Sequence, residues 1–446
     1  MHDATRRDWI AQPGAPLRGT LEVPGDKSVS HRAIMFAALA DGVSRIDGFL
    51  EGEDTRATAA IFAQLGVHID TPAPGVRVVH GVGIDGLRGS RAPLDCGNAG
   101  TAMRLLAGLL AGQRFDSLLV GDASLSRRPM ARVTRPLARM GARIDSGEGG
   151  VPPLCIHANT GLHGIDFTAE IASAQVKSAL LLAGLYADGE TIVREPQPTR
   201  DYTERMLAAF GYPIEFSPGL ARLRGGGRLR ATDVHVPADI SSAAFFIVAA
   251  SIVPGSQLRL RRIGLNPRRT GLLHVLRAMG ADITEEAIGQ HGGEPVADLL
   301  VRYAPLHGII VPREHVADMI DEFPALFVAA ACAQGPTTVT GAAELRVKES
   351  DRIAGMADGL RAMGIRVDET ADGATIHGGV LRGGVTVDSH GDHRLAMAFC
   401  VAAQRADAPL AIRDVANVAT SFPDFDGLAR AAGMGLRAHD GAALPA

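Results

Sequence analysis

The chain repeats one pattern six times, and this repeat constrains its fold more than any other feature of the sequence. Each copy is a run of small apolar residues that opens on polar residues and closes near a Gly. Such a run is typical of a buried helix, and successive starts lie roughly 65 to 80 residues apart. The six expected helices cover residues 28–40, 102–111, 173–187, 239–251, 321–333 and 392–403.

A second expected helix follows in each copy and ends at a Gly, and the alternating stretch after it predicts a strand. Clear copies occur at 63–69, 137–144, 276–283 and 360–367, and looser ones at 206–211 and 432–435. Each unit therefore reads as strand, helix, strand, helix, strand, strand. Because the first helices are apolar on most faces, we expect an α/β (α+β) fold in which six βαβαββ units bury their helices inside sheets.

Six units divide naturally into two groups of three, which predicts two domains. The first helix begins directly after an expected strand at 17–23, so this strand is expected to pair with the later half of the chain. The predicted boundaries are a discontinuous domain of residues 1–22 plus 240–446 and an inserted domain of residues 23–239. The hinges are expected near 21–24 and 236–241.

Composition limits the kinds of protein that this chain can be. It has 446 residues, of which 46% are hydrophobic and 21% charged, as in a globular chain large enough for two domains. The net charge of −4 argues against a nucleic-acid partner, and no apolar run predicts a membrane span or a leader. We expect a cytoplasmic monomer with no structural zinc. The expected free thiols are Cys96, Cys155, Cys332 and Cys400, which lack the spacing of metal ligands.

The start of the first helix has the groups of an anion-binding site. In residues 25–32 a Gly turn leads into a helical turn that carries hydroxyl groups and two cations, Lys27 and Arg32. Helix N-termini attract anions through unpaired N–H groups and the macrodipole. A Ser-capped surface helix with ordinary basic residues explains this segment alone equally well.

Further cations stand near the other helix starts. The whole set consists of Lys27, Arg32, Arg128, Arg200, Lys348, Arg352 and Arg394. Each of them alone is better explained as a solvated surface charge. Together, in a net acidic chain, they predict small polyanionic ligands bound between the domains, because Arg and Lys suit phosphate and carboxylate groups.

Two carboxylates near these cations are candidates for proton transfer. A helix from about Glu349 would place Lys348 and Arg352 on one face with Glu349 beside both, so that its carboxyl group could move a proton. A surface helix with a ladder of charges is the alternative. Asp321 is the second candidate, although its position at the start of an apolar helix also suits a plain N-cap. Residues 393–394 begin another buried helix, where capping and packing are the alternative roles.

Common nucleotide and acyl-enzyme motifs are missing from their usual context. The sequence has no Walker A loop and no Gly-x-Ser-x-Gly elbow, and no Gly-x-Gly-x-x-Gly opens a dinucleotide fold with an acidic residue downstream. Chemistry based on ATP, NAD or an acyl-enzyme is therefore disfavoured.

Laid end to end, these segments resemble the 5-enolpyruvylshikimate-3-phosphate synthase family, in the branch that includes glyphosate-tolerant enzymes. The matching pieces keep the family order and are residues 25–32, 98–101, 127–130, 173–175, 346–352, 392–394 and 421–424. The resemblance implies the two-domain enolpyruvyl-transferase fold, with three βαβαββ units in each domain. It also implies transfer of the enolpyruvyl group of phosphoenolpyruvate to the 5-hydroxyl of shikimate 3-phosphate. Phosphate would leave through a tetrahedral intermediate in the interdomain cleft, without a metal or organic cofactor.

The same resemblance implies roles for residues at the matching positions. Shikimate 3-phosphate would be held by Lys27, Ser28, Arg32, Ser173, Ala174, Gln175, Arg200, Asp321 and Lys348. Phosphoenolpyruvate would be held by Lys27, Gly100, Arg128, Gln175, Arg352 and Arg394. Asp321 would be the base for the 5-hydroxyl, and Glu349 would be the acid–base partner for the methylene carbon. Lys27 would take part in these proton transfers.

Two positions bear on phosphoenolpyruvate and its competitor. Thr420 stands where the enteric branch of the family has a Lys, so one contact is missing or supplied elsewhere. Gly100 stands where tolerant members have Ala, so we expect the inhibitor glyphosate to bind in the room that a methyl group would fill.

Two other functions remain as alternatives. The sister enolpyruvyl transferase that acts on UDP-N-acetylglucosamine has a reactive Cys on a mobile loop, and Cys96 is the cysteine in that general region. A non-catalytic anion-binding relative would be expected to have lost Asp321, Glu349 or Lys27, and all three are present.

Overall fold

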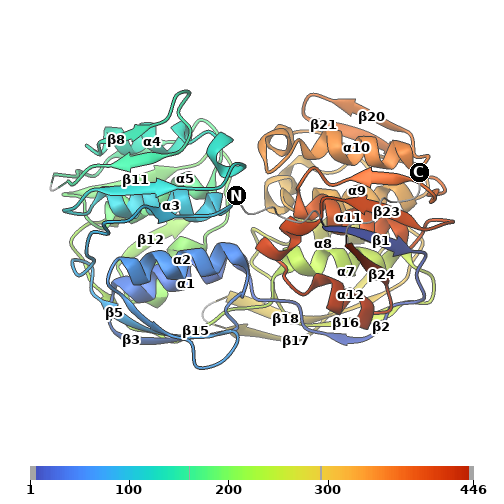
Figure 1. Cartoon of the computed structure of the whole chain (residues 1–446), viewed down its shortest axis with the longest axis horizontal. Helices are drawn as coiled ribbons and strands as arrows, with labels where there is room; N and C mark the ends of the chain where they lie inside the picture. The colour runs from blue at the N-terminus through green and yellow to red at the C-terminus, as the bar shows by residue number, and fades with distance from the viewer. Residues whose placement is uncertain (1–6, 160, 292–293, 441–446) are drawn as a thin grey trace. The chain divides into compact units, whose positions relative to one another are not determined.

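The computed structural model describes residues 7–159, 161–291 and 294–440 and contains two compact units of alternating helices and strands (Figure 1). The split unit comprises Met1–Pro24, Ala238–Gly289 and Pro295–Ala446, and the inserted unit comprises Gly25–Pro237 with Gln290–Glu294. Across the described ranges, no helix combines the length and the apolar character that crossing a bilayer requires.

The inserted unit contains three repeats of the expected order. The first holds α1 (Lys27–Leu39), β3 (Ala40–Asp47), α2 (Glu53–Gln64), β4 (His68–Asp70) and β5 (Val76–Val82). The second holds β6 (Leu94–Asp95), α3 (Gly100–Ala111), β7 (Ser117–Val120), η1 (Leu125–Arg127), α4 (Ala131–Arg139), β8 (Ile144–Ser146) and β9 (Leu154–Ile156). The third holds β10 (Asp166–Thr168), α5 (Ala174–Gly184), β11 (Glu190–Arg194), α6 (Tyr202–Ala209), β12 (Ile214–Ser217) and β13 (Leu220–Arg224), before β14 (Leu229–Arg230) and β15 (Val234–His235).

The split unit contains the other three repeats. The first holds β2 (Arg18–Leu21), α7 (Ile240–Ile252), β16 (Gln257–Gly264), α8 (Gly271–Ala278), β17 (Asp282–His291) and β18 (Glu294–Arg302). The second holds η2 (Arg313–His315), η3 (Ala317–Met319), α9 (Phe323–Cys332), β19 (Pro336–Val339), η4 (Ala343–Val347), α10 (Arg352–Ala362), β20 (Val367–Thr370) and β21 (Gly373–His377). The third holds β22 (Thr386–Asp388), α11 (His393–Ala403), β23 (Leu410–Arg413), η5 (Ala416–Thr420), α12 (Phe425–Ala431), β24 (Gly435–Asp440) and β1 (Arg7–Gln12).

Five of the six repeats form small mixed sheets, and β19, β21 and β20 of the remaining repeat form an antiparallel one. The third repeat has the strand order β10-β11-β13-β12. β10 and β11 are parallel, with Asp166 opposite Ile192, because α5 carries the chain back between them. β13 pairs antiparallel with both β11 and β12. The βαβαββ order expected from the sequence is therefore confirmed.

Two sheets of the split unit are completed by the first strands of the chain. β2 pairs in parallel with β16, as expected for a strand at 17–23 that joins the later half. The sequence analysis did not expect β1, which lies between β23 and β24 and pairs antiparallel with both. The strand was not expected because it is only six residues long and has a weak apolar alternation. Of its residues only Trp9 and Ala11 are buried.

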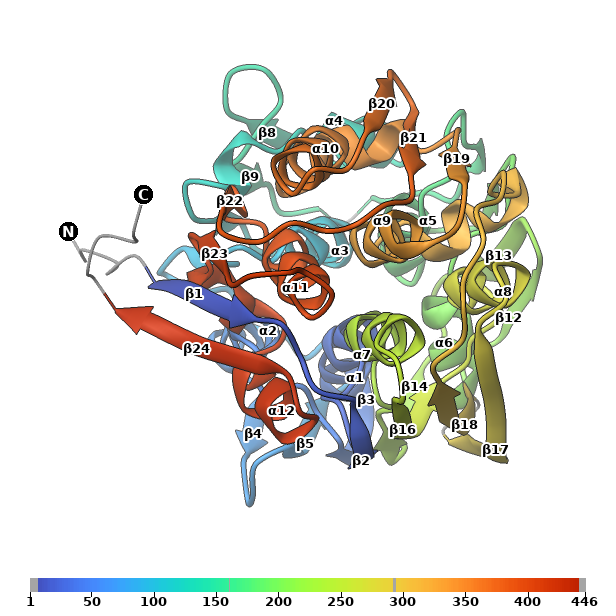
Figure 2. The same cartoon turned by 90° about the vertical axis from the view of Figure 1, so that its right-hand side faces the viewer.

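The first helices of the repeats are buried on all sides, as their composition predicts. In α7 every residue from Ile240 to Ile252 is buried, and α11 is buried along its whole length. Figure 2 shows α9 and α11 nearly end-on, with strands β19, β21, β22 and β23 outside them. Because their sides are enclosed, only the ends of these helices can present polar groups.

The second helices end as predicted, each at a Gly with a positive φ. The six residues are Gly66 (92°), Gly141 (93°), Gly211 (74°), Gly280 (97°), Gly364 (84°) and Gly433 (102°). A positive φ suits Gly because it has no Cβ, so each of these positions stops the helix and turns the chain into the next strand.

The helices α3 and α5 approach each other so closely that one position has no room for a side chain. A Cβ added to Gly108 of α3 would lie 2.0 Å from the carbonyl oxygen of Ala179 on α5. Backbone atoms cannot give way as a flexible side chain can.

We therefore predict that Gly108→Ala lowers the free energy of unfolding by about 2–3 kcal/mol or more, since the two helices must move apart. The measurement is the midpoint of urea unfolding followed by circular dichroism. Gly289→Ala is the matched control, because an added Cβ there has no heavy atom within 4 Å. A Gly108→Ala protein with the wild-type midpoint would contradict the close packing.

Candidate functional site

The start of α1 is held in place by Asp26. Its carboxylate accepts hydrogen bonds from the backbone N–H of Val29 at 2.9 Å and from the hydroxyl of Tyr202 at 3.1 Å. Gly25 is required because a Cβ at this position would lie 1.9 Å from the carbonyl oxygen of Gly48. The Gly turn recognised in the sequence thus fixes the N–H groups of the first helical turn.

Lys27 lies at the first position of α1 and already has an acidic partner. Its Nζ donates to Asp54 Oδ2 at 2.9 Å, and Asp54 is buried. The sequence analysis missed Asp54, which stands in an ordinary acidic first turn of α2 with no distinguishing signal.

Arg32 reaches back from the second turn of α1 and is buried. It donates to the Ser28 carbonyl at 3.0 Å, to Thr203 Oγ1 at 2.7 Å and to Ser178 Oγ at 2.9 Å. Burial lowers the pKa of Arg32 to about 10, against the opposing effect of Glu204. These neutral partners tie the starts of α1, α5 and α6 together around one guanidinium group.

Gly100 begins α3, and Arg128 lies directly beside it. Arg128 donates to Asn98 Oδ1 at 2.6 Å and to Ser124 Oγ at 3.2 Å. A Cβ at Gly100 would lie 3.0 Å from Nη1 of Arg128. The expected neighbours Gly100 and Arg128 are therefore brought together, and the room beside Gly100 is bounded by a guanidinium group.

Gln175, in the first turn of α5, connects this helix start with α3. Its Nε2 donates to Thr101 Oγ1 at 2.9 Å, and its Oε1 accepts from Arg104 Nη1 at 2.6 Å. Ser173 is the N-cap of α5 and accepts from Val176 N at 3.5 Å. The sequence analysis missed Arg104, although a signal was present: it is the single charged residue of α3.

The loop that carries Arg200 is fixed by a buried ion cluster that the sequence analysis also missed. Lys177 Nζ lies 2.7 Å from Glu195 and 2.8 Å from Glu204. Glu195 also accepts from the backbone N–H of Thr199 at 3.3 Å. Burial opposes the charge on Lys177, but the carboxylates of Glu204 and Glu195 outweigh it and raise its pKa. The signal was again a single charge in an apolar helix, α5.

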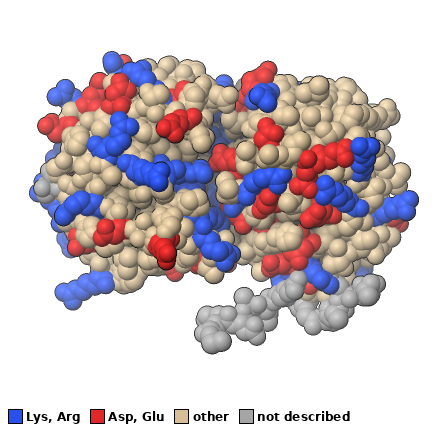
Figure 3. Space-filling view, turned by 90° about the horizontal axis from the view of Figure 1, so that it is seen from above, with Lys and Arg blue, Asp and Glu red and all other residues tan. Residues whose placement is uncertain are grey.

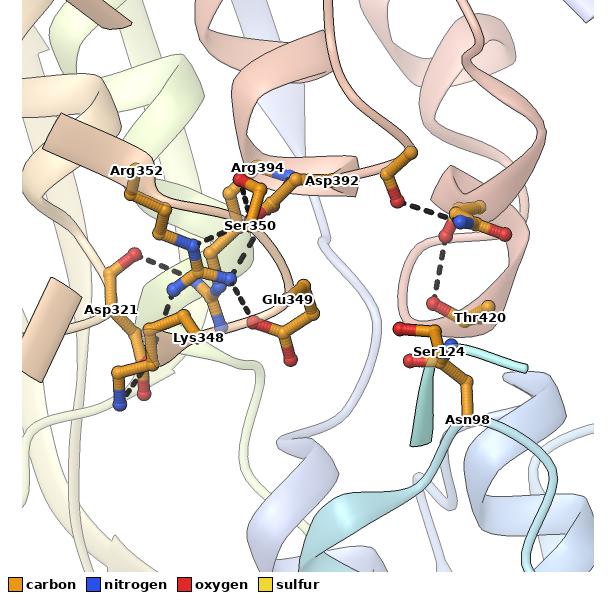
Figure 4. A network of polar contacts seen from close by, with 12 residues as sticks. Asn98, Ser124, Asp321, Lys348, Glu349, Ser350, Arg352, Asp392, Arg394 and Thr420 are labelled. Carbon is orange, nitrogen blue, oxygen red and sulfur yellow. Dashed lines mark hydrogen bonds and ion pairs between the residues drawn. The ribbon is translucent and has the colours of Figure 1, made fainter. Parts of the chain in front are cut away.

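In the split unit, Arg352 lies at the centre of three carboxylates (Figure 4). Its side chain is 1% exposed and lies 2.8 Å from Asp392, 2.6 Å from Glu349 and 3.5 Å from Asp321. Burial opposes its charge, but Asp392, Glu349 and Asp321 outweigh this effect and raise the pKa of Arg352. The guanidinium group thus orders both candidate proton-transfer residues.

The expected helix from about Glu349 is wrong. η4 ends at Val347 and α10 begins at Arg352, because Asp351 acts as the N-cap and accepts from Ala354 N at 3.0 Å. Lys348 and Glu349 therefore lie in an irregular segment. Lys348 nevertheless reaches the cluster, with its Nζ 3.6 Å from Asp321.

Asp321 is not the N-cap of its helix, since Glu322 occupies that position of α9. The Asp321 carboxylate faces Lys348 and Arg352 instead, and its carbonyl oxygen accepts from Arg394 Nη1 at 3.0 Å. Arg394, in the first turn of α11, is thereby brought to the same cluster.

The N-cap of α11 is Asp392, which accepts from Arg394 N at 2.9 Å. Burial disfavours its charge, but Arg352 outweighs burial and keeps the pKa of Asp392 below its ordinary value. A buried cation beneath the cluster, Arg269, was missed by the sequence analysis. It lies 3.3 Å from Asp239 and 3.6 Å from Glu322.

The side chain of Thr420 carries no charge. Its hydroxyl donates to the carbonyl oxygen of Asn417 at 2.7 Å at the end of η5. The side chain of Thr420 therefore does not replace the charged contact that a Lys would make at this position.

The four cysteines are free thiols. Cys96 is buried, and burial raises its pKa, so its thiol is a poor nucleophile. On the face drawn in Figure 3, Lys and Arg side chains are interspersed with Asp and Glu, as the small net charge requires.

The chain is similar to known proteins over nearly its whole length. Residues 11–428 match the family model described as EPSP synthase (3-phosphoshikimate 1-carboxyvinyltransferase). The chain is 71% identical over 430 residues to the 3-phosphoshikimate 1-carboxyvinyltransferase of Xanthomonas campestris pv. campestris (strain 8004), covering 96% of this chain and 98% of that protein. The enzyme of the same name from Xanthomonas axonopodis pv. citri (strain 306) is 71% identical over 428 residues, which are 96% and 97% of the two chains.

Solved structures agree with the fold. The EPSP synthase of Acinetobacter baumannii, solved at 2.37 Å, superimposes with a TM-score of 0.88 at 50% identity, covering 97% of this chain and all of that chain. The enolpyruvyl transferase NikO from Streptomyces tendae gives a TM-score of 0.80 at 18% identity over 98% of this chain and 100% of its own, which shows a shared fold.

His31, inside α1, generates a prediction about pH. Its Nδ1 lies 2.7 Å from Thr58 Oγ1, and burial, with Lys27 and Arg32 nearby, lowers its pKa to about 3. In the unfolded chain the His31 imidazole has its ordinary pKa of about 6.5. Between about pH 6.5 and pH 3 it therefore binds a proton in the unfolded chain but not in the native chain. The free energy of unfolding therefore decreases as the pH falls from about 6.5 toward 3, by up to about 1.4 kcal/mol per pH unit.

We predict that His31→Asn removes this contribution and makes the free energy of unfolding less steep in pH between about pH 6 and pH 4. The measurement is urea unfolding at several pH values, read as a slope so that a changed absolute stability does not matter. His235→Asn, at an exposed imidazole, is the control. Equal slopes for wild type and His31→Asn would contradict the prediction.

Proposed function

The chain belongs to the EPSP synthase (3-phosphoshikimate 1-carboxyvinyltransferase) family, and on this premise we propose which of its residues carry out the reaction. It transfers the enolpyruvyl group of phosphoenolpyruvate to shikimate 3-phosphate in the shikimate pathway. The observation that carries the proposal is the ordering of Asp321 and Glu349 around the buried guanidinium group of Arg352.

We assign shikimate 3-phosphate to polar groups of both units. In the inserted unit these are the starts of α1 and α5 with the loop before α6: Lys27, Ser28, Arg32, Ser173, Ala174, Gln175 and Arg200. In the split unit they are Asp321 and Lys348, which lie 3.6 Å apart. Hydroxyl, amide and cationic donors of this kind match a phosphate, a carboxylate and hydroxyl groups.

We assign phosphoenolpyruvate to Lys27, Gly100, Arg128 and Gln175 of the inserted unit and to Arg352 and Arg394 of the split unit. The N–H groups at the start of α3 add the positive end of a helix dipole. Arg128 donates to Asn98 and Ser124, and its planar guanidinium group suits a phosphate or a carboxylate.

The chemistry is an addition followed by an elimination. The substrate's 5-hydroxyl oxygen forms a bond to C2 of phosphoenolpyruvate while C3 takes up a proton, and a tetrahedral intermediate results. The intermediate then loses phosphate from C2 and a proton from C3, which restores the double bond. We propose that Asp321 accepts the hydroxyl proton and that Glu349 donates and then removes the C3 proton. Lys27 takes part in these proton transfers.

Glu349 is suited to move between partners. Its side chain is 22% exposed and lies on the irregular segment before α10, whereas Asp392 is buried at an N-cap. An incoming phosphate or carboxylate would compete for the same Arg352 N–H groups, so we propose that substrate binding releases Glu349 toward the reacting carbon.

The alternatives fit less well. A transferase that depends on a reactive cysteine is disfavoured by the buried thiol of Cys96. We further propose that the enzyme acts as a monomer in the cytoplasm. The support is that the most exposed large apolar side chains among the described residues, Ile171, Ile288, Ile310 and Val380, stand far apart in the sequence. The free thiols suit reducing conditions.

The test is an assay of phosphate release from phosphoenolpyruvate and shikimate 3-phosphate, with the organic product identified by mass. Wild type should release one phosphate for each enolpyruvyl product. We predict that Glu349→Gln lowers kcat by roughly 10²–10⁴-fold, because the amide can still accept from Arg352 but cannot move a proton. Binding of shikimate 3-phosphate, measured by calorimetry, should change little.

Glu369→Gln is the matched control. Glu369 is 25% exposed and lies 2.8 Å from Arg361, much as Glu349 lies 2.6 Å from Arg352. It stands on β20, and its ion-pair partners are Arg361 and Arg346 rather than Arg352. Its kcat should stay within about twofold of wild type. Wild-type turnover by Glu349→Gln would overturn its assigned role, and phosphate release without the expected product would overturn the substrate assignment.

A further prediction concerns glyphosate, which we propose competes with phosphoenolpyruvate beside Gly100. The Cβ of Gly100→Ala would press on Arg128 from 3.0 Å, so the guanidinium group must shift by a few tenths of an ångström. We expect the inhibition constant for glyphosate to rise by about tenfold or more, with a smaller rise in the KM for phosphoenolpyruvate. Gly289→Ala is the control, and an inhibition constant unchanged by Gly100→Ala would contradict the steric explanation.

A further inference from the structure

The hairpin of β4 and β5 brings together three side chains that the reaction does not use. His68 and Asp70 are two residues apart on β4 and so point to the same face, and His80 of β5 is directly opposite His68. Nε2 of each imidazole lies 3.0 Å from an oxygen of Asp70, Oδ1 for His68 and Oδ2 for His80. One nitrogen from each imidazole and one carboxylate oxygen all lie within 4.8 Å of one another.

The other repeats show what is special about this hairpin. In the second repeat, the imidazole of His157 lies 2.7 Å from Asp145, and the backbone N–H of His157 donates to the carbonyl of Arg143. In the fifth repeat along the chain, the imidazole of His377 lies 2.9 Å from Asp368, and the backbone N–H of His377 donates to the carbonyl of Arg366. Both hairpins thus repeat the His–Asp pair of His80 and Asp70.

The difference lies in the residue opposite the shared His. It is Arg143 or Arg366 in the two sister hairpins, and each is two residues before the Asp, where the first hairpin has His68. An Arg at this place supplies a cation and no ligand atom. Replacing it with His68 adds a second imidazole and turns a two-residue pair into a set of three possible ligands.

We propose that His68, Asp70 and His80 form a binding site for a divalent transition-metal ion of the Zn²⁺ type on the surface of the inserted unit. Two imidazoles and a carboxylate are ligands that Zn²⁺ accepts, and water would complete a tetrahedron. Around Zn²⁺ neighbouring ligand atoms lie about 3.3 Å apart, so the 3.0 Å contacts need only small side-chain rotations.

The site is accessible and rigid, which are the two conditions for binding an ion from solution. The three side chains are 69%, 50% and 44% exposed for His68, Asp70 and His80. The ladder between β4 and β5 fixes their backbones, with Asp70 opposite Val78. In the parts of the chain that the structure describes, His68, Asp70 and His80 are the set of His, Cys, Asp or Glu side chains whose possible ligand atoms all lie within 4.8 Å of one another.

The experiment titrates the whole protein with zinc chloride in a chelator-free buffer near neutral pH and follows the heat of binding. Wild type should bind one Zn²⁺, and its thermal unfolding midpoint should rise with zinc because only the folded hairpin holds the three ligands in place. His68→Arg, which copies the sister hairpins, should weaken the binding by about tenfold or more.

A second variant reverses the change. Arg366→His, added to His68→Arg, places a second imidazole beside His377 and Asp368 and should restore one binding site. Equal zinc affinity for wild type and His68→Arg would overturn the proposal, because the zinc would then be held elsewhere, for example by thiols. No binding by wild type would overturn it as well. Activity without added zinc should be unchanged in His68→Arg, which has no part in the assigned substrate contacts.

Discussion

The structure depends on one constraint: helices that are apolar on every side must be enclosed on every side. In α7 and α11 the sheets and neighbouring helices leave no lateral face for polar groups. Polar groups are confined to the helix ends, and at the N-terminal end N–H groups lack intrahelical partners and the dipole is positive. Burial of these apolar helices therefore leaves their N-termini as positions suited to anions. Cations and hydroxyl groups of the chain lie beside several of them.

Two buried arginines of the candidate site are held in different ways. In the inserted unit, Arg32 donates to the uncharged hydroxyl groups of Thr203 and Ser178. In the split unit, Arg352 is surrounded by Asp321, Glu349 and Asp392, so its charge is more than balanced. An anion that bound Arg352 would have to exchange with one of these carboxylates. Under the proposed function, that exchange would couple substrate binding to the placement of Glu349.

Much of this could be predicted from the sequence because it depends on periodic patterns. The six repeats, the family resemblance and the Gly residues that end the second helices are confirmed. The start of α10 was misplaced because the capping preference of Asp351 outweighed the charge spacing around Glu349. Arg104, Lys177 and Arg269 were missed because their partners lie on other elements, and only the folded chain brings a cation in α3 to an amide in α5. A single charge within an otherwise apolar helix was the usable signal for the first two.

The strand β1 has a consequence for the order in which the chain can fold as it leaves the ribosome. Its partners, β23 and β24, are made long after it, and the partner of β2 is β16. The three sheets of the inserted unit, by contrast, are complete once β15 has emerged. Domains generally fold as units during synthesis. β1 must therefore remain unpaired until β23 and β24 have been made, whereas β2 can pair as soon as β16 has emerged.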